Sequence, residues 1–361
     1  MTGHGVDPNA PGMSFRLSPR AFVAWVFASL GLLTGLPFAL AEAPAPVPGG
    51  FTLAVLPDTQ IYTWKYPATY PAQTRWLAEN ARRYNLAYVL HVGDITQHNT
   101  NHQWQVAADA HAVLDAKGIR YAITTGNHDL GPEGKASTRD TAFAQYFPPA
   151  TFKKWPTFGG LYDAEPDRMD NNFHRFEAGG RKWLILCLEF GPRDDVLRWG
   201  NEVLAKHPDR SAIIVTHAYL RPDNTRFNRH AFIKLKSIEV NMGMDSYALA
   251  KSKSGFNDGE DIWKKLASQH ANLALMVSGH VCFTGRLDSE GKHGNSVHQM
   301  VVDYQNGKEG GQGFLRLLQF HPDGQRVSVV DYSPLLDQVS ERKGTSYEFT
   351  LAPPPTARRQ P

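Results

Sequence analysis

Polar side chains able to bind metal or move protons follow several strand-like runs in this sequence. The stretch Gly126-Asn127-His128-Asp129 comes directly after the apolar run 121–124 and places an amide, an imidazole and a carboxylate on one turn. Other such runs end in Asp58 and Gln60, in Asp94, in His217, and in His280 and Cys282. Gly, Asn and Asp are favoured in turns for backbone reasons, so a single polar turn would mean little. Its repetition at five strand ends favours a functional site.

These residue types are suited to holding a cation. Two carboxylates that are buried together without a counter-charge repel each other and lose their hydration, which is costly. A bound cation removes that cost, and carboxylate and imidazole are ordinary ligands of zinc, iron and manganese. A bridging carboxylate can hold two such ions roughly 3.5–4 Å apart, a spacing that suits phosphoryl chemistry. The sequence therefore predicts a metal site, with a set of polar turns as the structural alternative.

The elements that must position these residues alternate between strands and helices in the first half of the chain. Strands are predicted at 51–56, 87–92, 121–124, 173–177, 182–188, 212–215, 273–277, 297–304, 314–320 and 327–332, and helices at 70–84, 103–117, 193–206 and 258–269. Such alternation implies parallel strands with helical crossovers, and in open α/β sheets sites form at the carboxyl ends of strands. We expect the polar strand ends to meet in one crevice, roofed by the long segments 130–172 and 218–257.

The polar strand ends also resemble a known family in their order. Asp58-x-Gln60, Gly93-Asp94, Gly126-Asn127-His128-Asp129, Thr216-His217 and Gly279-His280 are similar to the five motifs of the calcineurin-like metallophosphoesterase superfamily. The resemblance spans about residues 51–334 and implies an α/β fold with a two-sheet β-sandwich core flanked by helices. It implies hydrolysis of a phosphomonoester or phosphodiester by a metal-bound hydroxide. The implied partner is a phosphorylated small molecule, a nucleotide or a lipid head group.

The resemblance assigns the ligands of two divalent metal ions. Asp94 would bridge both ions. Asn127, His217 and His280 would complete the second site. Asp58 would hold the first ion. The ions would be zinc, iron or manganese.

Two other residues of the first site depart from the superfamily pattern, which commonly has His at the position of Gln60 and often at that of Cys282. An amide oxygen is a poorer ligand than imidazole, whereas a thiolate is a good, soft ligand that favours zinc or iron. We therefore expect a first site that is weak, different in metal or absent, and Gln97 could assist it. A hydrogen-bonding role for Gln60 and a buried-thiol role for Cys282 stay open.

The resemblance also implies the acid–base chemistry. His128 would contact the phosphate and protonate the leaving oxygen as the general acid, a task suited to imidazole, and Asp129 would orient His128. The alternative for His128 is a hydrogen-bonding turn residue. For the whole chain, the alternative is a protein that binds metal or a phosphorylated ligand without catalysis, because the first site is altered.

The two ends of the chain have different compositions from the rest. In residues 1–41, Arg16 and Arg20 precede the apolar run 21–40, and Ala39-Leu40-Ala41 supplies a cleavage site, as in a secretory signal peptide. We expect export to the periplasm or the cell exterior, with no stable membrane span after cleavage. An uncleaved anchor is the alternative, because the run approaches the ~20 residues that a span needs. Residues 42–50 are interpreted as a linker, 51–334 as the phosphoesterase domain and 335–361 as a frayed tail.

Composition excludes some other classes of function. The formal charge of +3 over 361 residues and the lack of a dense Lys/Arg tract argue against a nucleic-acid-binding patch. Cys187 lies in an apolar run typical of a buried strand, so a disulfide is not expected. Gly310-Gly311-Gln312-Gly313 is interpreted as a turn, since no Lys-Ser/Thr pair or helix follows it as in a phosphate loop.

Overall fold

The computed structural model describes residues 43–229, 232–235, 238–241, 243–281 and 283–355. Its strands are β1 (Phe51–Leu56), β2 (Leu86–His91), β3 (Tyr121–Ile123), β4 (Phe158–Leu161), β5 (Asn172–Ala178), β6 (Arg181–Cys187), β7 (Ser211–Val215), β8 (Phe232–Leu235), β9 (Ile238–Asn241), β10 (Leu273–Ser278), β11 (Phe283–Glu290), β12 (Ser296–Asp303), β13 (Leu315–Phe320), β14 (Arg326–Ser333), β15 (Gln338–Val339) and β16 (Ser346–Thr350). Its α-helices are α1 (Gln60–Lys65), α2 (Thr69–Asn80), α3 (Asn101–Ala116), α4 (Phe143–Tyr146), α5 (Pro149–Phe152), α6 (Asp194–Lys206) and α7 (Gly259–Lys265). Single turns of 3₁₀-helix occur at Asn127–Asp129, Pro132–Gly134, Met244–Ser246, Ala248–Lys251, Ala267–Gln269 and Lys308–Gly310.

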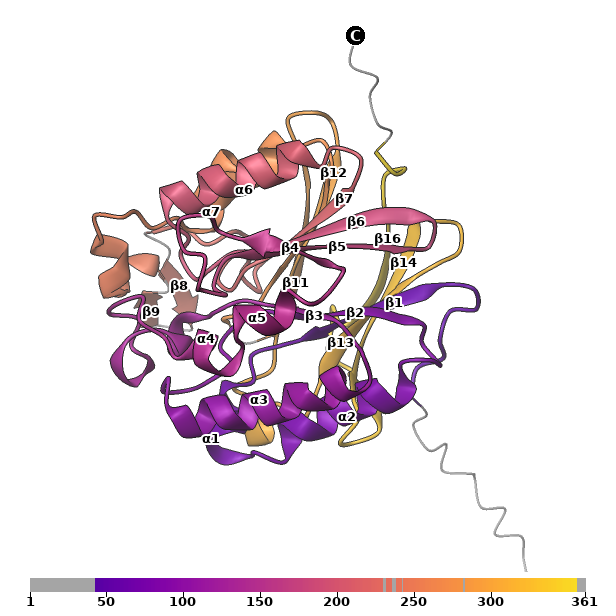
Figure 1. The fold of residues 1–361 in the computed structure, drawn as a ribbon, viewed down its shortest axis with the longest axis horizontal. Coiled ribbons are helices and arrows are strands. Elements are labelled where there is room, and N and C mark those ends of the chain that lie inside the picture. Colours follow the sequence, from indigo (N-terminus) through magenta and orange to yellow (C-terminus); the bar gives the residue numbers. More distant parts are fainter. Residues whose placement is uncertain (1–42, 230–231, 236–237, 242, 282, 356–361) are drawn as a thin grey trace, which may run out of the picture. The chain divides into compact units, whose positions relative to one another are not determined.

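Two mixed sheets carry the described part of the chain (Figure 1). The first has the order β15-β14-β13-β1-β2-β3, with β16 also paired to β14, and the second has the order β11-β12-β10-β7-β6-β5-β4. Strands β1, β2 and β3 are parallel, and so are β6, β7, β10 and β12. The predicted α/β fold with two sheets and flanking helices is confirmed.

The two sheets pack face to face through short, fully buried apolar strands. Leu53, Leu90, Ile185, Val215 and Val277 belong to one buried cluster that joins both sheets. Helices α2 and α3 cover the other face of the first sheet, and α6 and α7 lie on the opposite side, against the second sheet (Figure 1). Every residue of β1 is buried, as expected for a strand covered on both faces.

Local signals in the sequence set the ends of several helices. The Thr100 hydroxyl accepts a hydrogen bond from the amide of Gln103 and caps α3, and Gly118, at φ 69°, follows its end. The Asp258 carboxylate accepts a hydrogen bond from Asp261 N at 2.9 Å and caps α7. Helix α6 buries one face, including Leu197, Val203 and Leu204, in the way its apolar spacing predicts.

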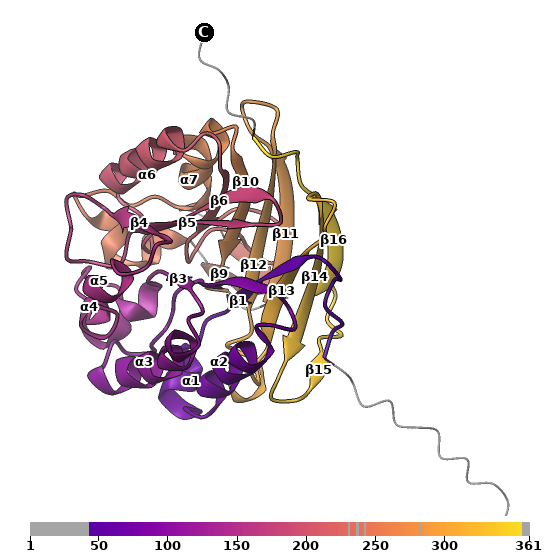
Figure 2. The same ribbon diagram turned by 45° about the vertical axis from the view of Figure 1, so that its right-hand side comes forward.

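The C-terminal segment was predicted wrongly as a tail from residue 335. Strands β15 and β16 hydrogen-bond to β14 and extend the first sheet at its edge (Figure 2). Tyr347 and Phe349 alternate with polar residues along β16, and both pack against the cluster between the sheets. A period-two pattern over five residues is a weak signal, and the Pro- and Arg-containing sequence around it obscured this one.

Other differences are smaller. Helix α1 and strand β11 were not predicted, and the helix predicted at 70–84 ends at Asn80. The segment 130–172 contains α4, α5 and β4 rather than one long loop. Within the residues that the structure describes, no helix is long and apolar enough to cross a membrane. The predicted signal peptide 1–41 and Cys282 lie outside the described residues.

Candidate metal centre

The loops after β2 and β3 approach each other closely at Asp94. Gly93 has φ 93° and Asp94 has φ 50°, so the chain turns sharply after β2. A Cβ atom on Gly126 would lie 2.2 Å from Asp94 Oδ1, so only glycine fits at that position. The amide of His128 donates to Asp94 Oδ1 at 2.9 Å. Gly93 and Gly126 therefore allow the loop after β3 to approach the loop after β2 and to hold the Asp94 carboxylate.

His217 presents one nitrogen to several acceptor atoms. Its Nδ1 donates to the Val92 carbonyl at 2.9 Å, so the lone pair of the neutral ring is at Nε2. That Nε2 lies 3.1 Å from Asn127 Oδ1, 3.2 Å from Asp94 Oδ2 and 3.2 Å from His280 Nδ1. The ligand atoms of Asp94, His217 and His280 all lie within 4.8 Å of one another. Lone pairs gathered this closely in a buried place repel, and a cation among them would turn that repulsion into coordination.

Electrostatics favour the protonation states that a metal requires at two of these residues. Burial by itself would raise the pKa of Asp94, but His217 and His128 lower it to about 2. Burial, with His217 nearby, lowers the pKa of His280 to about 3. Burial also acts to lower the pKa of His217, but the Asp94 carboxylate outweighs it and raises that pKa. At neutral pH Asp94 is therefore an anion and His280 a neutral base, as metal ligands must be.

The ends of β1 and β10 meet across the two sheets at Asp58. Both carboxylate oxygens of Asp58 lie within hydrogen-bond distance of His280 N, Oδ1 at 3.2 Å and Oδ2 at 3.0 Å. A Cβ atom on Gly279 would lie 2.1 Å from Asp58 Oδ1, and His280 itself has φ 81°. As at Asp94, a glycine before the ligand allows a carboxylate from another strand to reach the backbone.

Gln60 lies beside Asp58 in the sequence and begins α1. Its side chain is 4% exposed, and its Oε1 accepts no hydrogen bond from any residue that the structure describes. A buried amide oxygen without a partner costs about 1–3 kcal/mol, so the position suits a cation that would accept it as a ligand. The residues present thus fit a metal at both predicted sites. The role predicted for Cys282 stays a prediction, since that residue is not described.

His128 is half-buried, and the described contacts do not show the orienting role predicted for Asp129. His128 Nδ1 donates to the Gln97 carbonyl at 3.0 Å, and this contact orients the ring. Asp129 Oδ2 accepts from the amides of Ile95 (3.0 Å) and Gly126 (2.8 Å), and its Oδ1 accepts from Thr96. Asp129 thus holds the turn that carries Asp94, and no described contact joins it to the His128 imidazole.

A sixth strand end contributes two residues that were not predicted. Strand β12 runs parallel to β10 and ends at Asp303, which is fully buried. Gln305 Nε2 lies 3.3 Å from Asp58 Oδ2, 3.0 Å from the His280 carbonyl and 3.0 Å from Asp303 Oδ2. A strand was predicted at 297–304, so extending the strand-end argument to it would have found Gln305, whereas Asp303 lies inside the predicted range.

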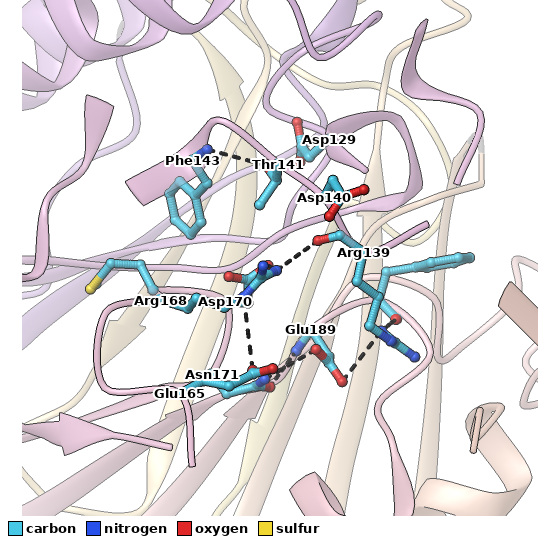
Figure 3. A network of polar contacts seen from close by, with 12 residues as sticks. Asp129, Arg139, Asp140, Thr141, Phe143, Glu165, Arg168, Asp170, Asn171 and Glu189 are labelled. Atoms are coloured by element: carbon cyan, nitrogen blue, oxygen red, sulfur yellow. Dashed lines mark hydrogen bonds and ion pairs between the residues drawn. The ribbon is translucent and has the colours of Figure 1, made fainter. Parts of the chain in front are cut away.

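The segment 130–172, the first of two long inserts, is fixed beside this centre by ion pairs (Figure 3). Arg139 lies 3.3 Å from Glu189 and donates to the Phe190 and Gly191 carbonyls, and Arg168 donates to Asp170 at 3.0 Å. The Phe190 ring centroid lies 5.9 Å from that of His217 and 5.8 Å from that of His280. The insert is therefore joined to the segment that follows β6. Phe190 in that segment packs on the imidazoles of His217 and His280.

Comparisons with known proteins show which family and which structures the chain is similar to. Residues 51–283 match the sequence model of the family described as calcineurin-like phosphoesterase. The uncharacterised protein YvnB of Bacillus subtilis (strain 168) is 33% identical over 318 residues, which cover 85% of this chain and 22% of that protein. A dimetal phosphatase from Danio rerio aligns at 13% identity and TM-score 0.49 over 85% of this chain and 100% of that one. The purple acid phosphatase PPD1 from yellow lupin (Lupinus luteus) seeds aligns at 13% identity and TM-score 0.45, over 85% and 55%.

Proposed function

The chain belongs to the calcineurin-like phosphoesterase family, and from this premise we propose that it hydrolyses a phosphoester bond with two divalent cations held at its strand ends. One observation carries the proposal. Atoms of Asp94, Asn127 and His280 all lie about His217 Nε2, at the place where a cation would be bound. When bound, such cations polarise the phosphoryl group and lower the pKa of a water molecule.

The protein's own residues would divide the work between two sites. Asp94 would serve both sites, and Asn127, His217 and His280 would hold the second cation. Asp58 and Gln60 would hold the first, since the Gln60 oxygen is buried without a described hydrogen-bond donor. Cys282, two residues after His280, is proposed as a further ligand on the sequence alone.

His128 is proposed as the general acid. Its Nδ1–H is held by the Gln97 carbonyl, so Nε2 is the nitrogen that can exchange a proton with a substrate. In the imidazolium form Nε2 donates to a phosphate oxygen and then gives its proton to the departing oxygen. Its amide is bonded to Asp94, so the acid is held at a fixed place beside the cations.

The substrate is proposed to be a phosphorylated small molecule, a nucleotide or a lipid head group. The inserts 130–172 and 218–257 carry residues beside the centre and would select among these. Export is proposed on the sequence of residues 1–41, and amino-terminal sequencing of the mature protein tests it.

Turnover of an aryl phosphate and of its diester, with manganese, zinc or ferrous iron added, tests the function. We expect hydrolysis that His128→Ala lowers by about 100-fold or more. His207→Ala is the matched control, because its Nδ1 also contacts a backbone carbonyl, Val203 O at 2.9 Å, but far from the centre along α6. Bound metal with no turnover on any ester would instead support the non-catalytic alternative.

A further inference from the structure

Residues 303–313 comprise the last residue of β12 and most of its connection to β13, and they lie against the proposed first metal site from two directions. At their start, Gln305 Nε2 faces a carboxylate oxygen of Asp58, the His280 carbonyl and Asp303 Oδ2. All three are acceptors, which fixes this atom as the amide nitrogen. Further along, Gly313 N donates to the Tyr62 hydroxyl at 3.0 Å, and Gly310 (φ 75°) packs so closely that a Cβ atom would lie 2.7 Å from Ile61.

These contacts reach both predicted ligands of the first cation. Asp58 receives the Gln305 amide directly. Gln60 is the first residue of α1, and its neighbours Ile61 and Tyr62 are the residues that the glycine-rich end of the connection touches. The connection therefore supports the site with the weak amide ligand.

Asp303 orients the Gln305 side chain. Its Oδ1 accepts the Gln305 backbone amide at 2.8 Å, and its Oδ2 accepts the side-chain amide at 3.0 Å. With both oxygens engaged by one residue, Asp303 fixes the glutamine rotamer instead of acting as a ligand itself. Burial raises the pKa of this carboxyl to about 6, although the hydrogen bonds from Gln305 act to lower it.

Gln305 also stabilises an unusual backbone. His280 has φ 81°, which is costly for a residue with a side chain. Its amide donates to Asp58 and its carbonyl accepts from Gln305, so the peptide units on both sides are held. The conformation aims the imidazole at the second site while the backbone supports Asp58.

We propose that residues 303–313 are the positioning device of the first metal site. Gln305 donates to Asp58 and to the His280 carbonyl, Asp303 orients Gln305, and the glycine-rich end seats α1 and with it Gln60. The role rests on the proposed two-cation function. It explains how a site with an amide in place of an imidazole can retain a cation, because outer hydrogen bonds commonly set the affinity of metal ligands.

The test is metal binding by Gln305→Met, which keeps the length of the side chain and removes its donor. Apo protein is titrated calorimetrically with Mn²⁺, and metal content after dialysis is measured by mass spectrometry. We expect two ions in the wild type, with the weaker one bound about 10–100-fold less tightly in the variant. The ion held by Asp94, Asn127, His217 and His280 should be retained.

Gln319→Met is the matched control. Gln319 is also buried and also bonded, accepting from Val47 N at 2.8 Å, but it pairs with Thr52 at the opposite end of β1 from Asp58. Its metal binding should equal that of the wild type. Asp303→Asn should weaken the first ion less than Gln305→Met, about tenfold.

Three outcomes overturn the inference. If wild type and Gln305→Met bind two ions with equal affinity, the inference fails while the proposed function stands. If Gln305→Met lowers the melting temperature of the apo protein more than Gln319→Met does and weakens both ions alike, Gln305 has a general structural role. If the wild type binds no cation, the inference and the proposed function fail together.

Discussion

Two buried polar clusters lie side by side in this protein, and they are satisfied in opposite ways. In the cluster that fixes residues 130–172, Glu165, Asp170 and Glu189 each have a guanidinium partner. Arg193 contacts Glu165 at 2.6 Å and Glu189 at 2.9 Å. Arg168 contacts Asp170 at 3.0 Å (Figure 3). In the metal centre, no described Lys or Arg forms an ion pair with Asp94, whose neighbours are imidazoles and an amide. One cluster is electrically complete, and the other needs a cation.

The difference separates structure from function. Buried charges that are paired and hydrogen-bonded fix a segment in place, whereas buried acceptors without a cation are costly unless something binds there. The two clusters should therefore respond in opposite ways when a carboxylate is removed or a metal is added.

The largest expected effect is that of Asp94→Asn on turnover. The change removes the anion shared by both proposed sites, and loss of metal chemistry worth several kcal/mol lowers kcat/KM by at least about 100-fold. Asp170→Asn removes a buried carboxylate of the complete cluster and should leave kcat/KM of the folded fraction within a few-fold of wild type. Comparable losses in the two variants would remove the distinction between the clusters.

Metal should stabilise the fold through the incomplete cluster. Free cation held at about 1,000 times its Kd raises the free energy of unfolding by about 4 kcal/mol, since the unfolded chain lacks the site. Urea unfolding with manganese and with a chelator measures the difference. The stabilisation by manganese should vanish in Asp94→Asn and persist in Glu165→Gln. A wild-type protein with the same urea midpoint under both conditions contradicts the prediction.

A change in the cluster of Glu165, Asp170 and Glu189 should lower stability without changing metal binding. Glu189 is 1% exposed and lies within 3.3 Å of Arg139 and 2.9 Å of Arg193. Glu189→Gln leaves these cations short of a partner, and we expect a loss of about 3 kcal/mol in the free energy of unfolding. The number of metal ions bound should not change. Loss of metal with full stability would reverse the assignment of the two clusters.

The smallest effect concerns pH. A direct hydrogen bond from Arg193 lowers the pKa of Glu165, outweighing burial, which raises it. A carboxyl whose pKa is lower in the folded state adds stability above its unfolded pKa of about 4.3 and loses it as the pH falls through the folded value. Glu165 is 24% exposed, so its contribution is about 1 kcal/mol or less. The advantage of wild type over Glu165→Gln in urea should be constant near neutral pH and shrink in acid.

The sequence predicted the part of the centre that rests on strand ends. Asp58, Asp94, Asn127, His217 and His280 each follow an apolar run, and the parallel order of strands brings such ends to one edge. Glycines before Asp94, Asn127 and His280 have a physical reason, since close contacts or positive φ angles require them at these turns.

What the sequence left out depends on side-chain direction. Asp129 stands beside His128, yet its carboxylate faces the Ile95 and Thr96 amides, and the Gln97 carbonyl orients the imidazole instead. Gln305 lies 247 positions from Asp58, and no local pattern connects them. Strand β16 escaped prediction because its alternation is short and exposed on one face.

A metal-soaked crystal structure with anomalous scattering at the absorption edge of the added metal would show whether cations bind at these strand ends. We expect one peak among Asp94, Asn127, His217 and His280, and a second, weaker peak beside Asp58 and Gln60. Anomalous density at neither place, with the four ligand side chains turned away from a shared point, would contradict it.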